Sequence, residues 1–263
     1  MSSQNHIEDF RDKVRRGRTC IGIGVGLNDP QISEMAGDIG YDFTWLDMEH
    51  APMNIETGLA HVMACRGTGC APFVRVPSHD PVLIKPFLEL APAGIIVPRI
   101  QTVEDTRTAV AACRYPPKGI RGYGPTRGAT YKGLDQKAFL DTAENEPMVF
   151  VQIEDIEAVR NIDGILAVEG LEGIALGPND LSGSMGMLGN PDAPEVVAEM
   201  DRVIEKARRT DKLIGVSTGF SPESFAGWIG KGVHWINLNT DFINFFRESK
   251  RVLDDAHRLV EEA

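Results

Sequence analysis

The sequence predicts an α/β fold, a TIM (β/α)8 barrel, and three observations support that prediction. Short apolar runs alternate, nearly to the end of the chain, with segments whose apolar residues recur at helical spacing. This alternation is typical of a parallel sheet wrapped by helices. Eight such units fit a chain of 263 residues, since the barrel usually needs about 250. A doubly wound sheet, the alternative, usually has fewer strands, and no GxGxxG motif opens a predicted helix.

The elements follow in order along the chain. The predicted strands are residues 19–25, 42–47, 71–76, 94–98, 148–154, 173–178, 212–218 and 234–239. Between them, residues 55–67, 80–90 and 194–210 carry apolar residues at helical spacing and are predicted helices. No low-complexity linker or internal repeat divides the chain, so we expect a single barrel domain over residues 1–263.

Composition excludes several classes of protein. A formal net charge of -11 and a pI near 5.0 argue against a nucleic-acid partner. The N-terminus "MSSQNHIEDF" lacks the pattern of a signal peptide, and no apolar run reaches membrane-spanning length. We therefore expect a cytoplasmic protein without a membrane partner. The four cysteines form no CxxC pair or zinc-ligand spacing, which indicates reduced core thiols.

One connection stands out from the rest. Residues 115–133, "YPPKGIRGYGPTRGATYKG", lie between the fourth and fifth predicted strands and are rich in Gly, Pro and Arg. Long loops in compact domains are usually functional or disordered. Because loops that follow strands open on the catalytic face of a barrel, we predict a substrate lid or wall here. A mobile surface excursion is the alternative.

Polar residues gather where four predicted strands end, which is where the catalytic groups of a barrel lie. They are Asp47, Glu49, His50, Arg75, Gln152, Glu154, Asn179 and Asp180. Glu154 and Asp180, at neighbouring strand ends, would repel each other unless a cation lies between them. Two hard oxygen ligands with open positions suit Mg²⁺ or Mn²⁺ and a chelating substrate. Separately, Asp180 could cap a helix and Glu154 could be an exposed strand end.

His50 is a candidate base, because a carboxylate bonded to one ring nitrogen would make the other nitrogen more basic. Asp47 and Glu49 are near enough in sequence to do this; a structural histidine is the alternative. Arg75, inside an apolar run, needs a carboxylate partner or an anionic ligand. No lysine stands at a predicted strand end, which disfavours a Schiff-base aldolase. A metal, a base and a cation together indicate enolate chemistry.

At these residues the chain resembles a known family. The segments "WLDMEHAPMN", "VRVPSHDPVLIK", "YPPKGIRGYGP" and "VQIEDIEAVRNIDGILAVEGLEGIALGPNDLSGSMG" are similar, in this order, to those of HpcH/HpaI class II 2-oxo-acid aldolases. The similarity runs from about Thr19 to about Asp241. It implies a metal-dependent enzyme, using Mg²⁺, Mn²⁺ or Co²⁺, that reversibly cleaves a 4-hydroxy-2-oxo acid to pyruvate, or a close analogue, and an aldehyde.

The resemblance also implies roles for site residues. Glu154 and Asp180 would hold the metal, His50, supported by Asp47, would be the base, and Arg75 would stabilise the transition state.

Further implied roles concern the substrate and a second subunit. Gln152 would contact the substrate, and the backbone around Asn179 and Asp180 would receive the pyruvyl carboxylate. Glu89 matches a carboxylate that supports the base of a neighbouring subunit. "GPND" departs from the more frequent "GPAD" or "GPSD", and "DMEH" from "DGEH", so acceptor preference is expected to differ.

Other functions stay open at this point. A citryl-CoA-type lyase and a macrophomate-synthase-like oxaloacetate decarboxylase share the same superfamily, and a catalytically silent oligomeric binding protein is the non-enzymatic alternative.

The closing segment predicts assembly. Residues 241–260 place apolar side chains at roughly helical spacing: Phe242, Phe245, Phe246, Val252, Leu253, Leu259 and Val260. From periodicity alone, packing on the same barrel and exchange with another subunit are equally compatible. The resemblance implies exchange, in a homo-oligomer that is a hexamer built as a trimer of dimers.

Overall fold

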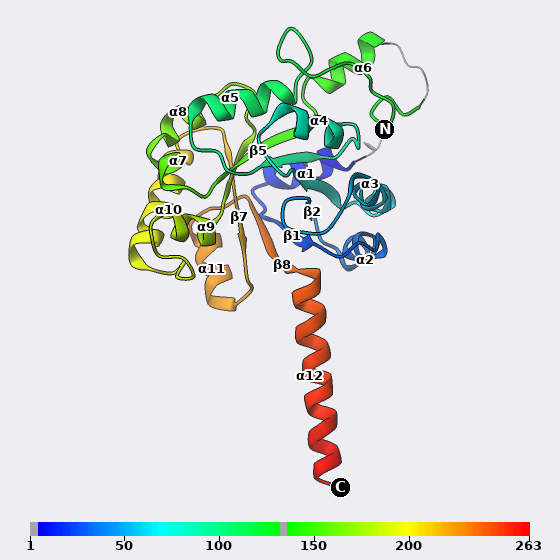
Figure 1. Ribbon diagram of the computed structural model, residues 1–263, viewed down its shortest axis with the longest axis vertical. Coiled ribbons are helices and arrows are strands. Elements are labelled where there is room, and N and C mark those ends of the chain that lie inside the picture. The colour runs from blue at the N-terminus through cyan, green and yellow to red at the C-terminus, as the bar shows by residue number, and fades with distance from the viewer. Residues whose placement is uncertain (1–4, 132–135) are drawn as a thin grey trace.

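Eight parallel strands close into a barrel in the order in which they occur along the chain (Figure 1). The computed structural model describes residues 5–131 and 136–263. The strands are β1 (Cys20–Val25), β2 (Phe43–Asp47), β3 (Ala71–Arg75), β4 (Gly94–Val97), β5 (Met148–Ile153), β6 (Gly173–Leu176), β7 (Leu213–Thr218) and β8 (Trp235–Thr240). All coincide with predicted runs, and only β8 extends beyond its run, by one residue. The predicted TIM barrel is confirmed.

Helices surround the barrel, and the last of them extends away from it (Figure 1). They are α1 (Ile7–Arg15), α2 (Gln31–Ile39), α3 (Ile55–Ala64), η1 (Cys65–Gly67), α4 (Pro81–Leu88), α5 (Val103–Ala112), α6 (Gln136–Ala143), α7 (Ile156–Arg160), α8 (Ile162–Leu166), α9 (Pro178–Ser184), α10 (Pro194–Ala207), α11 (Pro222–Gly230) and α12 (Asp241–Glu261). Local signals begin several of them. The side chains of Asn54, Asp80 and Ser221 accept backbone N–H bonds at the starts of α3, α4 and α11, as helix-capping residues do.

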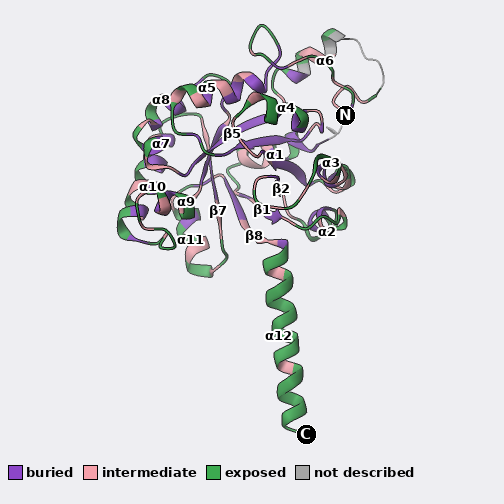
Figure 2. Cartoon of the chain, viewed as in Figure 1, coloured by how far each residue is buried: buried purple, intermediate pink, exposed green. Residues whose placement is uncertain are grey.

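Aromatic rings fill the lower half of the barrel interior. Phe43, Phe73, Phe150 and Trp235 pack against one another with ring centroids 5.1 to 6.0 Å apart, and Phe10 of α1 stacks edge-on against Phe73. The strands are buried on both faces, while the helices expose their outer sides (Figure 2). The half of the interior nearer the amino ends of the strands is therefore filled, so a substrate can enter only from the polar end, where the carboxyl ends of the strands lie.

The Arg-containing loop does not lie where the sequence predicted it. Helix α5 follows β4 directly, so residues 115–131 join α5 to the next segments at the amino ends of the strands. There the Arg121 guanidinium donates to the Leu88 carbonyl (3.2 Å), and Arg127 donates to the Leu90 carbonyl (2.8 Å), both at the end of α4. The predicted lid over this chain's own site was wrong, because the loop follows a helix and not a strand. Residues 132 and 133 of that prediction lie outside the described residues.

Helix α12 projects away from the barrel (Figure 1) and is exposed along nearly its whole length (Figure 2). The predicted helix is confirmed. All seven apolar residues named for it are exposed: Phe242, Phe245, Phe246, Val252, Leu253, Leu259 and Val260. Among its residues only Asp241 is buried, so the alternative of packing against its own barrel does not hold. What covers this face stays a prediction.

Two smaller expectations can be compared with the structure. All four cysteines are free and buried, as predicted. Among the described helices, none is both long enough and apolar enough to cross a membrane.

Candidate active site

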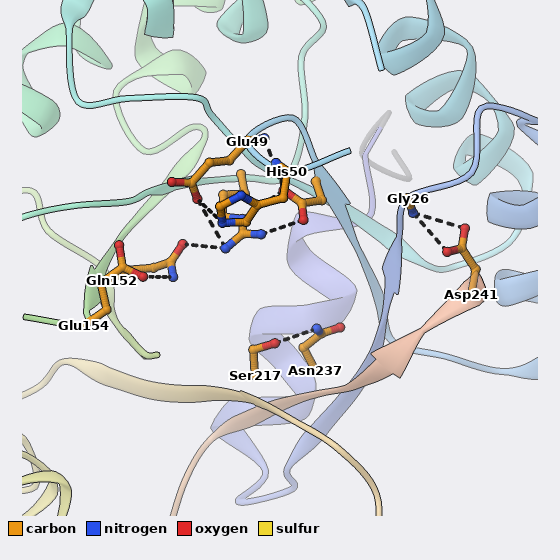
Figure 3. A network of polar contacts seen from close by, with 10 residues as sticks. Gly26, Glu49, His50, Gln152, Glu154, Ser217, Asn237 and Asp241 are labelled. Carbon is orange, nitrogen blue, oxygen red and sulfur yellow. Dashed lines mark hydrogen bonds and ion pairs between the residues drawn. The ribbon is translucent and has the colours of Figure 1, made fainter. Parts of the chain in front are cut away.

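The carboxyl ends of β2, β3 and β5 bring four of the predicted site residues together. Asp47 and Arg75 are direct neighbours in the register of β2 and β3, and Gln152 and Glu154 come from the end of β5. Figure 3 shows Glu49, His50, Gln152 and Glu154 in one group. The convergence predicted from the strand ends is thus present in the fold.

Arg75 is held by Asp47 in a two-pronged ion pair. Nε and Nη2 of Arg75 donate to the two carboxylate oxygens of Asp47 at 3.1 and 2.5 Å. Asp47 also accepts the backbone N–H groups of Glu49 (3.1 Å) and His50 (3.0 Å). Burial would raise the pKa of Asp47, but the charge and hydrogen bonds of Arg75 outweigh it, and the pKa is lowered. Of the two partners that the sequence predicts for Arg75, a carboxylate or an anionic ligand, the structure shows the carboxylate, and this pair orients the guanidinium.

Glu49, rather than Asp47, faces the imidazole of His50. Its Oε2 lies 3.6 Å from Nε2 of His50 and 3.3 Å from Nη1 of Arg75, yet this buried oxygen accepts no hydrogen bond in the described structure. Burial raises the pKa of Glu49 against the opposing charge of Arg75. The His50 side chain is 63% exposed at the rim. The carboxylate that faces the imidazole ring is therefore Glu49, while Asp47 reaches only the His50 backbone.

Glu154 is the most strongly perturbed carboxylate of the group. It is 7% exposed; its oxygens accept the Arg99 backbone N–H at 2.7 Å and the Gln152 amide at 2.6 Å. Burial, together with the negative charges of Glu49 and Asp180, raises the pKa of Glu154 to about 7. A carboxylate kept close to other carboxylates in a buried place is a frequent sign of a working site.

A glycine makes room for Glu154, and sequence reasoning missed it. A Cβ on Gly177, at the end of β6, would lie 2.8 Å from Cβ of Glu154 and 3.0 Å from its Oε2. Any larger residue would push the carboxylate out of place.

Asn179 and Asp180 lie in the first turn of α9, directly after β6, and both are exposed. The negative charge of Asp180 contributes to the raised pKa values of Glu49 and Glu154, after the effect of burial. The Asn179 carbonyl accepts the Ser182 hydroxyl at 2.6 Å, which stabilises this turn.

These residues fit a divalent cation. Glu154 and Asp180 offer hard oxygen ligands. Burial first, and then the negative charges of Glu49 and Asp180, raise the pKa of Glu154, and a bound cation would offset both effects. The part of the chain that the structure describes holds no cluster of three or more His, Cys, Asp or Glu side chains arranged for a metal. The protein would supply two carboxylates, and solvent or substrate the remaining ligands.

Glu89 lies elsewhere. It caps the end of α4, at the amino ends of the strands, where its carboxylate pairs with Arg121 at 3.2 Å. It cannot support His50 of the same chain, so its implied role requires a second chain.

Two further polar residues were missed by sequence reasoning. Asn237 of β8 donates to the hydroxyl of Ser217 on β7 at 2.9 Å (Figure 3). Uncharged residues inside apolar runs carry no chemical signal. Counting alternate residues from a lumen-facing Trp235 would have found Asn237, but the direction of Trp235 is known only from the fold.

Comparisons with known proteins agree with this geometry. The family model HpcH/HpaI aldolase/citrate lyase matches residues 21–241. The chain is 38% identical to the 4-hydroxy-2-oxo-heptane-1,7-dioate aldolase of Salmonella dublin over 207 residues, which is 79% of each chain. Its structure is similar to an HpcH/HpaI aldolase/citrate lyase family protein from Burkholderia cenocepacia J2315 (TM-score 0.87, 27% identity, 94% and 98% of the two chains). It is also similar to the citrate synthase SbnG (TM-score 0.86, 28% identity, 95% and 98%).

Proposed function

The chain belongs to the HpcH/HpaI aldolase/citrate lyase family and is a carbon–carbon lyase of the class II aldolase type; from that premise we propose that it cleaves a 4-hydroxy-2-oxo acid reversibly to pyruvate and an aldehyde. The observation that carries the proposal is the group at the ends of β2, β3 and β5. The guanidinium of Arg75, which Asp47 holds in place, lies there with the exposed imidazole of His50. The buried carboxylates of Glu49 and Glu154 lie in the same group and act on each other by charge. The name of the Salmonella relative, a 4-hydroxy-2-oxo acid aldolase, supports the substrate class.

The proposed cofactor is Mg²⁺, Mn²⁺ or Co²⁺, with Glu154 and Asp180 as its protein ligands. When bound, the ion would neutralise the negative charge that develops on the 2-oxo group. No lysine lies at the strand ends within the described residues, which supports this route over a Schiff base.

His50 is the proposed base. It lies at the rim, where it can take a proton from the C4 hydroxyl in cleavage or from the methyl group of pyruvate in synthesis. Glu49, at 3.6 Å, would stabilise the imidazolium that forms.

Arg75 and Gln152 are proposed to orient the 2-oxo acid. Asp47 occupies Nε and Nη2 of Arg75, while Nη1 makes only a long hydrogen bond, of 3.5 Å, to Oε1 of Gln152. Nη1 is therefore the nitrogen that would reach a substrate oxygen that gains charge, and such a contact typically lowers the barrier by about 3 to 4 kcal/mol. Gln152 is oriented by Glu154, and the backbone around Asn179 and Asp180 would receive the substrate carboxylate.

The test is a cleavage screen of 4-hydroxy-2-oxo acids with enzymatic detection of pyruvate, run with Mn²⁺ and with a chelator. We expect pyruvate release that the chelator abolishes and Mn²⁺ or Mg²⁺ restores. Full activity in the chelated enzyme, or pyruvate trapped on a lysine by borohydride, would contradict the proposal. A CoA thioester and oxaloacetate, tested in parallel, separate the citryl-CoA-type lyase and the decarboxylase. The likeness to a citrate synthase is weaker, at 28% identity, than the 38% shared with the aldolase.

We also propose that the partner is a second copy of this chain, in a hexamer built as a trimer of dimers. The exposed apolar face of α12 supports this, as does the position of Glu89, which is of use to His50 only across an interface.

A further inference from the structure

A small pocket lies at the end of the barrel opposite the proposed active site. It has a volume of about 390 Å³ and lies where α10 and α11 end and where β7 and β8 begin. This volume is in the range of small-molecule sites. Among the residues that line the pocket are Arg208, Thr210, Asp211, Lys212, Gly232 and His234.

The lining is basic, although the protein as a whole is acidic. The chain carries a formal net charge of -11, whereas the pocket has two permanent cations, Arg208 and Lys212, a histidine and one carboxylate, Asp211. The Asp211 side chain is 86% exposed and lies 3.2 Å from Nζ of Lys212. An exposed carboxylate in such a pair contributes little stability. The positive charge of this pocket is therefore only weakly compensated.

Arg208 has a guanidinium without an acceptor. Within the described part of the chain, its side chain makes no hydrogen bond and no ion pair, while the next residue, Arg209, pairs with Glu205. A Cβ on Gly232 would lie 3.8 Å from Nε and 3.9 Å from Cζ of Arg208, so the guanidinium packs beside the turn that leads into β8. A cation after the last turn of α10 favours the helix dipole. That role leaves the five N–H donors of the guanidinium unused.

Lys212 is held at the pocket by the turn between α10 and β7. The hydroxyl of Thr210 donates to the Ala207 carbonyl at 2.7 Å and accepts the backbone N–H of Lys212 at 3.1 Å. The Lys212 side chain is 13% exposed, and its ammonium has one partner in the described structure, the largely exposed Asp211. An ammonium carries three hydrogens. This mostly buried cation can therefore bind a second anion, which would offset the cost of its burial.

His234 adds a neutral donor. Its Nδ1 accepts the backbone N–H of Ile214 at 3.0 Å, and burial lowers the pKa of the ring. The ring is therefore neutral at pH 7, and because Nδ1 is an acceptor, the single ring proton lies on Nε2. The described residues provide no acceptor for this Nε2–H.

We propose that this pocket binds a phosphate group, with Arg208, Lys212 and His234 as its donors. The planar guanidinium matches two phosphate oxygens, and the ammonium supplies a point charge. The Nε2–H of His234 reaches a further oxygen, which a tetrahedral phosphate offers and a planar carboxylate lacks. The pocket is larger than one phosphate group, so it leaves space for the organic part of a phosphate monoester. This site is independent of the proposed aldol reaction.

Isothermal titration calorimetry of the full chain with Mg²⁺ tests the proposal, at about pH 7.5, where a phosphate monoester carries nearly two charges. The probes are inorganic phosphate and glycerol 3-phosphate, and acetate at matched ionic strength is the control anion. Saturable binding of phosphate and of glycerol 3-phosphate is expected in the millimolar range or tighter, and none of acetate. The probe that binds more tightly identifies the source of the phosphate group, a free ion or an ester.

Variants locate the binding. Arg208→Gln should weaken it by about 10-fold or more, because charge-assisted hydrogen bonds are lost. Since Arg208 is exposed, this change is expected to leave the fold intact. Lys212→Met, checked for folding by circular dichroism, should weaken binding to a similar extent. Arg209→Gln is the matched control, because it removes the same charge one residue further on, outside the lining, and should change Kd by no more than about 2-fold.

The outcomes separate this pocket from other anion sites. Phosphate bound at the proposed metal would not respond to Arg208→Gln and would compete with pyruvate, whereas binding in this pocket should leave Kd unchanged in saturating pyruvate. Absence of saturable binding, equal binding of acetate, or an unchanged Kd in both Arg208→Gln and Lys212→Met would overturn the proposal.

Discussion

At the residue scale, the two acidic residues at the end of β2 have different partners: Asp47 binds Arg75, and Glu49 faces His50. The two-pronged pair fixes the orientation of the guanidinium, and it lowers the pKa of the Asp47 carboxyl against the effect of burial. Both carboxylate oxygens of Asp47 therefore accept hydrogen bonds, from Arg75 and from the backbone N–H groups of Glu49 and His50. Glu49, whose inner oxygen has no donor, remains available to the imidazole of His50.

This division leads to a prediction about the base. His50→Ala is expected to lower kcat by about 10²- to 10⁴-fold with the fold intact by circular dichroism, because the proposed proton acceptor is gone. Glu49→Gln should lower kcat and shift the pH profile of kcat/KM, since the charge facing the imidazole is lost. Asp47→Asn should cost less than His50→Ala and should act through Arg75, without that shift. Normal turnover by His50→Ala would show that the histidine is structural.

Glu154 provides a prediction about pH and metal. Its pKa is raised from an ordinary value of 4.5 to about 7 by burial and by neighbouring carboxylates. A raised pKa stabilises the fold below the unfolded value, and this contribution is lost as pH rises through about 7. The rise corresponds to at most about 3 kcal/mol. In the metal-free protein, Glu154→Gln should therefore be more stable than wild type at pH 8 and about equal to it near pH 4.5.

Thermal unfolding at both pH values, with and without Mn²⁺, checks this. Added Mn²⁺ should raise the melting temperature of wild type most at pH 8, where Glu154 is ionised, and should do little for the variant. Equal melting temperatures for the two metal-free proteins at pH 8 would contradict the burial argument.

At the scale of elements, the local sequence does not determine where α12 and the segment after α5 lie in the fold. The strands are buried on both faces, so their apolar runs predict them closely. Helix α5 has few large apolar residues, so helical spacing does not predict it, although Thr102 and Asp105 form a capping box at its start. Without this helix, the sequence places the following loop at the wrong end of the barrel.

Helix α12 gives the prediction at this scale. Phe246 is 71% exposed, and Phe246→Asp should disrupt assembly because it places a charge on the apolar face that a second copy is proposed to cover. Arg247→Gln, which changes the net charge by the same amount at an exposed position on the opposite side of α12, is the control and should assemble as wild type does. Light scattering at micromolar concentration measures the mass of each. A wild type that is monomeric and fully active would refute the exchange.

For the whole molecule, the question is whether one chain contains a complete site. Glu89 and His50 lie at opposite ends of the same barrel, so a shared site needs two chains. His50→Ala and Glu89→Ala are each expected to be impaired. Mixing them under conditions that allow subunits to exchange should recover a part of wild-type activity, because some sites then combine an intact His50 with an intact Glu89.

Recovery is measured as pyruvate release after mixing, against each variant alone at the same total concentration. A matched mixture of His50→Ala with Arg75→Ala, both proposed for the same site of one chain, should recover less if Glu89 crosses the interface. Absence of any recovery in an assembly that demonstrably exchanges subunits would remove Glu89 from the site.

The barrel and the residues at its carboxyl ends could be predicted from the sequence alone. Burial on both faces forces a strand of a parallel barrel to be apolar, so the eight runs and the charged residues that end them are visible without coordinates. Motif similarity added roles for Glu154, Asp180 and His50 that periodicity cannot supply. The apolar helix face of residues 241–260 was equally predictable, because helical spacing is a local property, but only the structure shows that this face is exposed.

Only the tertiary structure decided which carboxylate meets which partner. Asp47 and Glu49 are two residues apart, and nothing local determines that one turns to Arg75 and the other to His50. The pairing of Ser217 with Asn237, the space left by Gly177 and the position of the loop after α5 depend on register between strands far apart in sequence. Side-chain direction across a closed barrel is set by that register, and it has no counterpart in the order of residues along the chain.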